Sequence, residues 1–199
     1  MKLHLGCFNK IVDGWYNTDV TAHIFISKIP CAAALIHFLG KMTDQRYEEH
    51  KVGLFKKVNY LNVAKKFSFK SNSVEAIFSS HIIEHLSPRV AEHMLSESLR
   101  VLTSEGICRV VAPSLELAIS SYTEKDPEKA LNMIFEHDHA NPKNQHQWMY
   151  TGSSLVQLME KVGFVDVQIA SFGEGNLPDL KKLDNRPENS IYVEGRKGS

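Results

Sequence analysis

The chain has few of the features that define several large protein classes. Its 199 residues include three cysteines, Cys7, Cys31 and Cys108, and no Cys-x-x-Cys pair. An odd number without such a pair argues against a disulfide framework and against a cysteine zinc site. Lys plus Arg equals Asp plus Glu at 23 each, so the formal net charge is zero. Proteins that bind mainly to phosphates usually carry a basic excess, and we therefore expect no nucleic-acid partner.

Long hydrophobic runs are also absent from the sequence. The most apolar stretch, residues 24–39, is interrupted by Lys28, Pro30 and His37. It is shorter than the roughly 20 apolar residues that a membrane span needs, so we expect no stable membrane insertion. We expect it to be buried in the monomer or against a second copy in a homodimer. Residues 1–6 reach a glycine turn too early for a signal peptide, which favours a cytoplasmic location.

Short apolar runs alternate instead with amphipathic ones. This order is typical of an α/β fold, with a mainly parallel sheet and helices on both faces. The strand candidates are residues 2–5, 15–20, 58–61, 74–78, 107–112, 165–171 and 190–194. The clearest helix is 88–102, with Ser87 as N-cap, Pro88 in the first turn and Gly106 as its stop. Residues 153–162 and, with a break near 126–127, 115–136 are further helical segments.

Two connections between the predicted strands are unusual. Between Gly6 and Trp15 there is no room for a crossover helix, which normally needs about a dozen residues. We expect an inserted helical or loop segment at about 21–57 to supply the missing helix within a single domain over 1–199. The long polar segment 173–189 predicts an antiparallel strand pair at one edge of the sheet.

Polar residues and a glycine follow the predicted strands, where an open parallel sheet binds its ligands. Gly6 allows a ligand to approach the backbone. Asp19, after the second strand, can accept hydrogen bonds from both hydroxyls of a ribose. A polar side chain after the third strand can reach a base edge. The candidate clusters are Gly6-Cys7-Phe8-Asn9, Asp19, Asn62-Val63 and Ser79-Ser80-His81.

These clusters lie in stretches with a recognisable pattern. Residues 3–8 read Leu-His-Leu-Gly-Cys-Phe, and residues 14–19 read Gly-Trp-Tyr-Asn-Thr-Asp. The most specific block, residues 79–86, reads Ser-Ser-His-Ile-Ile-Glu-His-Leu. In this order the chain resembles a small group of class I S-adenosylmethionine-dependent methyltransferases, over nearly its whole length. The resemblance implies a Rossmann-like, seven-stranded methyltransferase fold with one antiparallel edge strand.

The resemblance also implies a cofactor site and a substrate class. The cofactor would be S-adenosylmethionine, with Gly6, Cys7 and Phe8 at its methionine part and Asp19 on its ribose. Asn62 and Val63 would meet the adenine, and Ser79, Ser80 and His81 would line the floor near the transferable methyl. The group is associated with small-molecule acceptors such as sugars in cell-surface polysaccharide pathways.

Two residues depart from the group's pattern. Phe8 stands where the group usually has a second glycine, and its ring could stack on the cofactor or block it. A blocked site would make the chain a non-catalytic scaffold or partner subunit, which is the alternative function. Asn62 stands where the wider class usually has Asp, but it still offers an acceptor oxygen to the adenine amino group.

Methyl transfer to a hydroxyl requires removal of a proton, for which a neutral histidine is suited near pH 7. His81 is the first candidate because it follows the central strand, and His146 is the second. Trp148 and Tyr150 could form the apolar wall on which a sugar ring packs. The alternative is that His81 supports the turn and that Trp148 belongs to the core.

Residues 81–85 also match the H-x-x-E-H pattern of inverted zinc peptidases, with His81 and His85 as ligands and Glu84 as base. The cluster His137-Asp138-His139, with His146, could supply further ligands. The block lies between a strand end and Ser87-Pro88, so at most one helical turn fits there. We therefore expect Glu84 and His85 to tie the loop to the following helix. The methyltransferase interpretation assigns no metal.

Overall fold

The computed structural model describes residues 1–135, 145–184 and 186–199. Within them a single sheet of seven strands has the order β3-β2-β1-β4-β5-β7-β6. The strands are β1 (Lys2–Leu5), β2 (Trp15–Asp19), β3 (Asn59–Tyr60), β4 (Val74–Ser80), β5 (Leu102–Pro113), β6 (Phe164–Ala170) and β7 (Ser190–Lys197). The predicted strands are confirmed, with ends that shift by a few residues.

The first five strands run parallel to one another, and β7 runs antiparallel to both β5 and β6. The predicted antiparallel pair at one edge is therefore β6 with β7. The reversed strand itself is β7, which lies one place inside the edge because β6 covers its outer side. A mainly parallel sheet with one reversed strand near its edge is the predicted class I methyltransferase fold.

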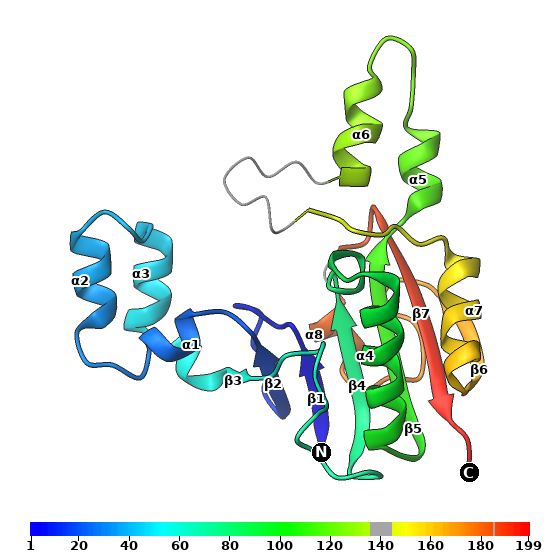
Figure 1. Ribbon diagram of the computed structural model, residues 1–199, viewed down its shortest axis with the longest axis horizontal. Helices are drawn as coiled ribbons and strands as arrows, with labels where there is room; N and C mark the ends of the chain where they lie inside the picture. Colours follow the sequence, from blue (N-terminus) through cyan, green and yellow to red (C-terminus); the bar gives the residue numbers. More distant parts are fainter. Residues whose placement is uncertain (136–144, 185) are drawn as a thin grey trace.

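Helices pack on both faces of this sheet (Figure 1). On one face, α4 (Pro88–Val101) and α7 (Gly152–Val162) contribute Leu95 and Leu155 to the main core, which also holds Ile77 of β4. On the other face, α8 (Leu180–Leu183) packs Leu180 over Phe78 of the same strand. Ile77 and Phe78 are neighbours, so the alternation of side chains along β4 supplies both faces.

The segment predicted as an insertion lies beyond β2. It contains α1 (His23–Ile26), α2 (Ala32–Phe38), α3 (Asp44–Lys51) and the 3-10 helix η1 (Leu54–Lys57). These elements extend outward from the β2–β3 side of the sheet (Figure 1). Phe55 is fully buried, whereas Phe38 on α2 is 86% exposed. Among the described residues, no helix is long and apolar enough to cross a membrane. The expected homodimer stays a prediction.

The predicted ends of the clearest helix need correction. Pro88 does begin α4, but the Ser87 side chain makes no capping hydrogen bond to a described residue. The helix ends at Val101, and β5 begins at Leu102 rather than after Gly106. Gly106 therefore lies inside a strand instead of stopping the helix. A Cβ there would lie 2.9 Å from the Thr103 carbonyl oxygen, so the glycine allows a close backbone approach.

Two further helical segments lead to the site. Residues 115–136 were predicted as helical with a break near 126–127, and the structure places α5 (Leu115–Ser120) and α6 (Pro127–Phe135) there. The start of α7 has a reciprocal capping box, in which Thr151 accepts from the Ser154 amide and Ser154 accepts from the Thr151 amide. This cap fixes where the chain leaves residues 145–150, which cross the ends of the central strands.

A buried ionic cluster holds the segment before β7. The Arg109 side chain of β5 is fully buried, and its Nε and Nη2 donate to the two oxygens of Asp184 at 3.1 Å and 2.6 Å. Its Nη1 donates to Glu194 of β7 at 2.9 Å. The guanidinium also donates to the backbone oxygens of Ser171 and Glu174. Because every group is partnered, the polar loop 171–184 is fixed against the sheet.

Candidate functional site

The turn after β1 is shaped by Gly6. Its φ is +59°, and a Cβ added there would lie 2.2 Å from Cδ1 of Ile82. Both facts require glycine, because the left-handed conformation is costly for other residues and the space is already occupied. The Cys7 amide then donates to the Thr18 oxygen at 2.9 Å, which ties this turn to β2.

Phe8 follows this turn with a φ of +44°, a conformation more usual for the glycine it replaces. Its ring packs towards the 21–57 segment rather than across the turn. The Arg46 guanidinium lies 4.3 Å from the ring centroid, and the Phe55 ring lies 6.1 Å away. The phenyl group thus forms one wall of the adjoining cavity, held there by a cation–π contact.

Asp19 at the end of β2 is oriented by two backbone amides. Its Oδ2 accepts from Phe8 N at 3.0 Å, and its Oδ1 accepts from Thr21 N at 2.7 Å. A carboxylate has about four acceptor sites, so each oxygen can accept one further hydrogen bond. The geometry presents two fixed acceptors side by side, which suits a vicinal diol.

A cavity of about 540 Å³ lies over these residues, at the carboxyl ends of the parallel strands. Its volume is within the range of small-molecule sites, about 300–1,000 Å³. It is lined by Gly6, Phe8, Asp19, Val20, Thr21, His23, Leu61, Val63, His81, Ile82 and His85. The structure therefore brings together Gly6, Phe8, Asp19, Val63 and His81 of the predicted site.

Asn62, Cys7, Ser79 and Ser80 have other surroundings. The Asn62 oxygen accepts from Ala64 N at 2.9 Å, so it stabilises its own loop. Cys7 is buried, and burial with the nearby Asp19 charge raises the pKa of its thiol to about 12, which keeps it protonated. Cys7 and Ser80 line a smaller cavity of about 190 Å³ beyond the Gly6 turn. Ser79 is buried, and its hydroxyl has no hydrogen-bond partner among the described residues.

His81 lies where three cavities meet, with a φ of +54° directly after β4. Its Nε2 is 3.0 Å from the Ser190 hydroxyl. Its Nδ1 is 3.2 Å from Arg186 Nη1 and 3.2 Å from Oε1 of Glu84. Arg186 donates to this nitrogen, and the Glu84 carboxylate lies within ion-pair distance of it without making a hydrogen bond. The ring therefore supports the turn and also borders the large cavity.

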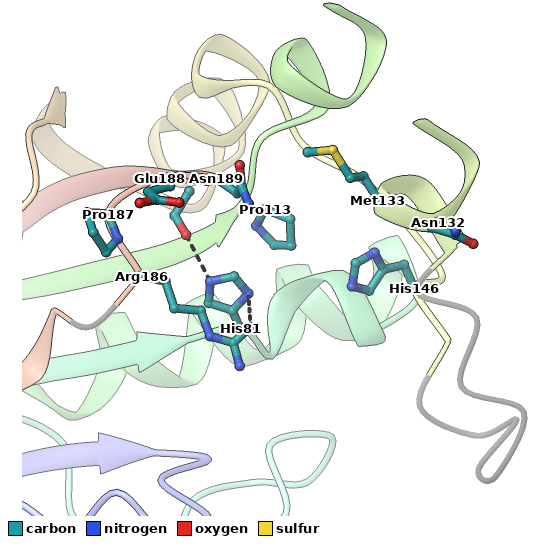
Figure 2. Close-up of a pocket in the computed structure, with 10 residues that line it drawn as sticks. His81, Pro113, Asn132, Met133, His146, Arg186, Pro187, Glu188 and Asn189 are labelled. Atoms are coloured by element: carbon teal, nitrogen blue, oxygen red, sulfur yellow. Dashed lines mark hydrogen bonds between the residues drawn. The ribbon is translucent and has the colours of Figure 1, made fainter. Parts of the chain in front are cut away.

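A second cavity, of about 380 Å³, lies above the ends of β4 and β5 (Figure 2). Its walls come from β5, α6 and the segment before β7. It is lined by both polar and apolar residues, namely His81, Pro113, Asn132, Met133, His146, Arg186, Pro187, Glu188, Asn189 and Ser190. Figure 2 shows both predicted histidines, His81 and His146, at this cavity, on opposite sides of its floor. Their imidazoles border the same cavity although the two residues are 65 positions apart in the sequence.

The two aromatic residues predicted as an acceptor wall have different environments. Trp148 is 51% exposed and lines a shallow cavity with His146, so it does not belong to the core. Tyr150 is only 3% exposed and packs in the main core. Burial and the nearby Glu84 charge raise the pKa of its hydroxyl to about 12. In this conformation Trp148 alone of the pair can contact a ligand.

Glu84 and His85 form the 3-10 helix η2 (Ile83–His85) and hold a loop, though not to the following helix as predicted. The backbone carbonyl oxygen of Glu84 accepts from the amides of Gln147 and Trp148 at 2.7 Å and 3.1 Å. The His85 oxygen accepts from Gln147 Nε2 at 2.7 Å. Residues 145–148 are thereby fixed over the end of β4.

The H-x-x-E-H motif does not adopt the zinc-peptidase arrangement. That arrangement needs two histidines one helical turn apart on the same helix face. Here His81 has a left-handed backbone, and only the three residues of η2 follow. The further ligands predicted at His137, Asp138 and His139 lie outside the described residues. Glu84, His85 and His146 do form a group, whose ligand atoms all lie within 4.8 Å of one another.

Sequence reasoning missed the part that the segment before β7 plays. Arg186 contacts His81 across 105 residues of sequence, and Glu188 and Asn189 line the second cavity. No local spacing signals these contacts, since they depend on the Arg109 cluster that holds the preceding loop.

Comparisons with known proteins agree with the fold. No family model matches the chain, and no curated protein matches it significantly. A SAM-dependent methyltransferase from Thermotoga maritima, described as a possible histamine N-methyltransferase, is 16% identical, with a TM-score of 0.55 over 98% of this chain and 81% of that one. A SAM-dependent methyltransferase from Archaeoglobus fulgidus is 15% identical, with a TM-score of 0.53 over 98% and 85%.

A possible exported protein from Bordetella parapertussis is 10% identical, with a TM-score of 0.55 over 99% of this chain. The chain spans only 61% of that protein's length. At these identities the likeness concerns the fold alone, which is that of class I SAM-dependent methyltransferases. The predicted link to cell-surface polysaccharides stays a prediction.

Proposed function

We propose that the chain binds S-adenosylmethionine in the 540 Å³ cavity and transfers its methyl group to a small acceptor. The observation that carries this proposal is the Asp19 carboxylate, which two backbone amides hold at the cavity wall. Charge-assisted hydrogen bonds to the ribose diol suit this geometry. The Gly6 turn provides backbone at close approach for the methionine part.

Phe8 supports the enzyme over the non-catalytic scaffold. A ring that blocked the cofactor would fill the cavity, whereas the Phe8 ring is drawn against Arg46 and packs beside Phe55. With this ring in its wall, the cavity of about 540 Å³ still lies within the range of small-molecule sites, about 300–1,000 Å³. A scaffold remains the second candidate, and it predicts no cofactor binding.

We assign the acceptor to the 380 Å³ cavity, which adjoins the first at His81. Amide, carboxylate and guanidinium groups from Asn132, Glu188 and Arg186 can hydrogen-bond several hydroxyls, as a sugar or related metabolite requires. The exposed Trp148 ring offers a stacking surface near His146. In this scheme the oxygen of the acceptor hydroxyl attacks the methyl carbon in line with the sulfonium sulfur.

His81 is the residue we place as general base. The acceptor O–H gives its proton to the imidazole while the new C–O bond forms. The C–S bond breaks with its electron pair going to sulfur, which leaves S-adenosylhomocysteine. Proton removal by a positioned side chain contributes roughly 10²–10⁴-fold to a rate.

The test is an assay of S-adenosylhomocysteine release with a panel of sugars, nucleotide-sugars and small alcohols. With a productive acceptor, we expect His81→Gln to lower kcat by roughly 10²–10⁴-fold. Its cofactor affinity should stay close to that of the unaltered chain. His37→Gln, at a half-buried position of α2 that lines neither cavity, is the matched control and should change neither quantity. A chain that neither binds the cofactor nor turns over any acceptor would favour the scaffold.

A further inference from the structure

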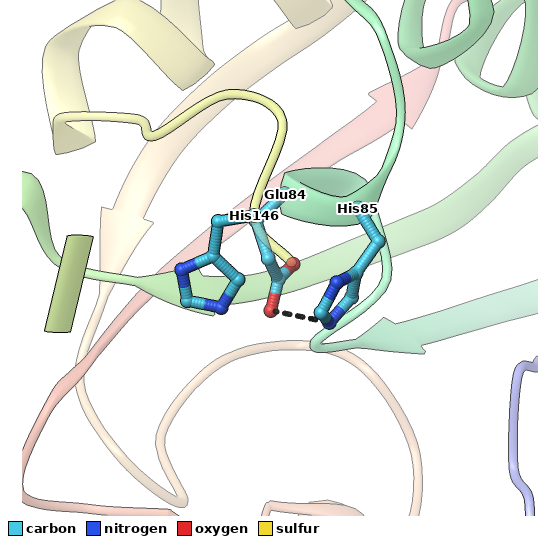
Figure 3. A group of neighbouring side chains, drawn as sticks. All are labelled: Glu84, His85 and His146. Atoms are coloured by element: carbon cyan, nitrogen blue, oxygen red, sulfur yellow. Dashed lines mark ion pairs between the residues drawn. The ribbon is translucent and has the colours of Figure 1, made fainter. Parts of the chain in front are cut away.

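Three side chains converge beside the two cavities in an arrangement typical of metal ligands (Figure 3). Glu84, His85 and His146 each offer one ligand atom, and these atoms lie within 4.8 Å of one another. The Glu84 carboxylate lies between the two imidazole rings, whose centroids are 5.1 Å apart. We propose that this group, here named the Glu84 cluster, binds a divalent transition-metal ion of the zinc type.

The first support is the state of the Glu84 carboxylate. The side chain is 0% exposed, and neither oxygen has a hydrogen-bond partner among the described residues. A buried carboxylate without donors is costly, and such a group commonly marks a position for water or an ion. Within the described part of the chain, the ion-pair partners of this carboxylate are His81 at 3.2 Å and His85 at 4.0 Å, both charged only when protonated.

The second support is the orientation of the two imidazoles. Nδ1 of His85 lies 3.4 Å from the Gln145 oxygen, and Nδ1 of His146 lies 3.1 Å from the Ile134 oxygen. An Nδ1–H that donates to a backbone carbonyl fixes the tautomer in which Nε2 is the basic nitrogen. Histidines that bind metals usually have such a partner on their other nitrogen.

The third support is the rigidity of the backbone that carries the cluster. The Gln147 and Trp148 amides both donate to the backbone carbonyl oxygen of Glu84, and the Gln147 side chain donates to the backbone carbonyl oxygen of His85. These bonds hold the loop that carries His146 against the turn that carries the other two ligands. Tetrahedral ligands about 2.1 Å from zinc lie about 3.4 Å apart, so binding needs the ligand atoms, which lie within 4.8 Å of one another, to move together by up to about 1.4 Å.

The ligand types select the ion. Two imidazoles and one carboxylate suit Zn²⁺ and its transition-metal neighbours, whereas Mg²⁺ and Ca²⁺ prefer oxygen ligands. Three protein ligands leave at least one position for a substrate atom, as in catalytic zinc sites. A metal here departs from the methyltransferase interpretation of the sequence, which assigned none.

The position of the cluster suggests what the ion would do, and this part rests on the proposed function. His85 lines the proposed cofactor cavity, and His146 lines the proposed acceptor cavity. An acceptor hydroxyl bound at the open position would lose its proton more readily, because a bound cation lowers the pKa of an oxygen ligand. The proton would pass to His81, and the oxygen would then attack the methyl carbon as described above.

The test measures metal binding without cofactor. The full chain is stripped with a chelator and titrated with Zn²⁺ against a chromophoric competitor, and Co²⁺ absorption reports the ligand geometry. We expect one Zn²⁺ per chain, and at least roughly tenfold weaker binding in Glu84→Gln, His85→Gln and His146→Gln. The matched control is His37→Gln, which removes a half-buried histidine of α2 whose Nε2 is 2.7 Å from Asp44, and it should bind as the unaltered chain does.

Several results would overturn the metal site. These are no stoichiometric binding, equal binding by all three variants, or loss of binding in His81→Gln but not in His146→Gln. Far-ultraviolet circular dichroism checks that each variant is folded, and any one folded ligand variant suffices for the test. Because cofactor binding is measured separately with the chelator present, failure of the metal site leaves the proposed function standing, and the reverse also holds.

Discussion

Arg109 on β5 and Glu84 in η2, just after β4, are two buried charged groups that differ in how many of their polar atoms have a hydrogen-bond partner. Arg109 is fully buried, and all three of its guanidinium nitrogens donate to carboxylates or backbone oxygens. Glu84 is also fully buried, but its two carboxylate oxygens have no hydrogen-bond partner among the described residues. The first arrangement is what stability alone requires. The second leaves binding capacity unused beside two cavities, which is typical of a site rather than of a core.

Loss of Arg109 should have the largest effect. Arg109→Met leaves the Asp184 and Glu194 carboxylates buried without their cation, and breaking such a pair costs about 3–5 kcal/mol. The free energy of unfolding, from urea denaturation, should fall by that amount. The matched control is Arg196→Met on β7, because Arg196 pairs with Glu105 and Asp166 at the exposed surface. Exposed pairs contribute about 0–1 kcal/mol, so equal losses in the two variants would contradict the comparison.

A smaller effect on the free energy of unfolding is expected at His4, another buried polar side chain that has a hydrogen-bond partner. Its Nδ1 is 3.2 Å from the Asn17 oxygen, and burial lowers its pKa from 6.5 to about 4. Between these values the unfolded chain binds a proton that the folded chain does not, so stability rises with pH over this window and falls on acidification. The shift corresponds to about 3 kcal/mol between pH 7 and pH 4.

The check compares urea denaturation of the unaltered chain and His4→Gln at several pH values. Other groups titrate in both proteins, so the quantity of interest is the difference between their pH slopes. His4→Gln should lose less stability on acidification by about 3 kcal/mol. Equal pH dependence of the free energy of unfolding in the two proteins would show that the pKa of His4 is not lowered in the folded chain.

The smallest effect should come from Glu84 itself. In the presence of chelator, Glu84→Gln removes a buried charge that lacks hydrogen-bond donors, while it loses the attraction of the nearby imidazoles. These terms oppose each other, so the free energy of unfolding should change by less than about 1 kcal/mol. A loss of several kcal/mol would place Glu84 with Arg109 as a structural group and remove the contrast between them.

Much of the fold could be predicted from the sequence because its signals are local. The alternation of short apolar strands with amphipathic helices indicated the sheet, and Pro88 marked a helix start. The same signals failed around 102–106, where Leu102 pairs with Val74 of β4 and residues 103–106 form an irregular stretch of β5 before Ile107 pairs with Ala76. Strand pairing depends on residues distant in sequence, which local patterns do not report.

The candidate site, like the fold, could be predicted from the sequence only in part. Gly6, Asp19 and His81 were predictable because each lies at the end of a strand or directly after it, where the local pattern sets the strand end. The contact of Arg186 with His81 was not predictable, and the zinc-peptidase hypothesis joined His146 to Glu84 and His85 only as a further ligand of a motif that does not adopt its expected arrangement. Those contacts exist only once two loops have folded over the end of β4. Asn62 fits the expected position in sequence, but its oxygen is used within its own loop.

The central claim is that the cavity over Gly6 and Asp19 binds S-adenosylmethionine. Isothermal titration calorimetry of the metal-free chain with this cofactor tests it most directly. We predict one cofactor per chain, with affinity about 10–100-fold weaker in Asp19→Asn, because charge-assisted hydrogen bonds contribute about 1.5–3 kcal/mol. Asp13→Asn, an exposed acidic residue in the preceding loop, should bind as the unaltered chain does. The absence of both heat and thermal stabilisation with the unaltered chain would contradict the claim.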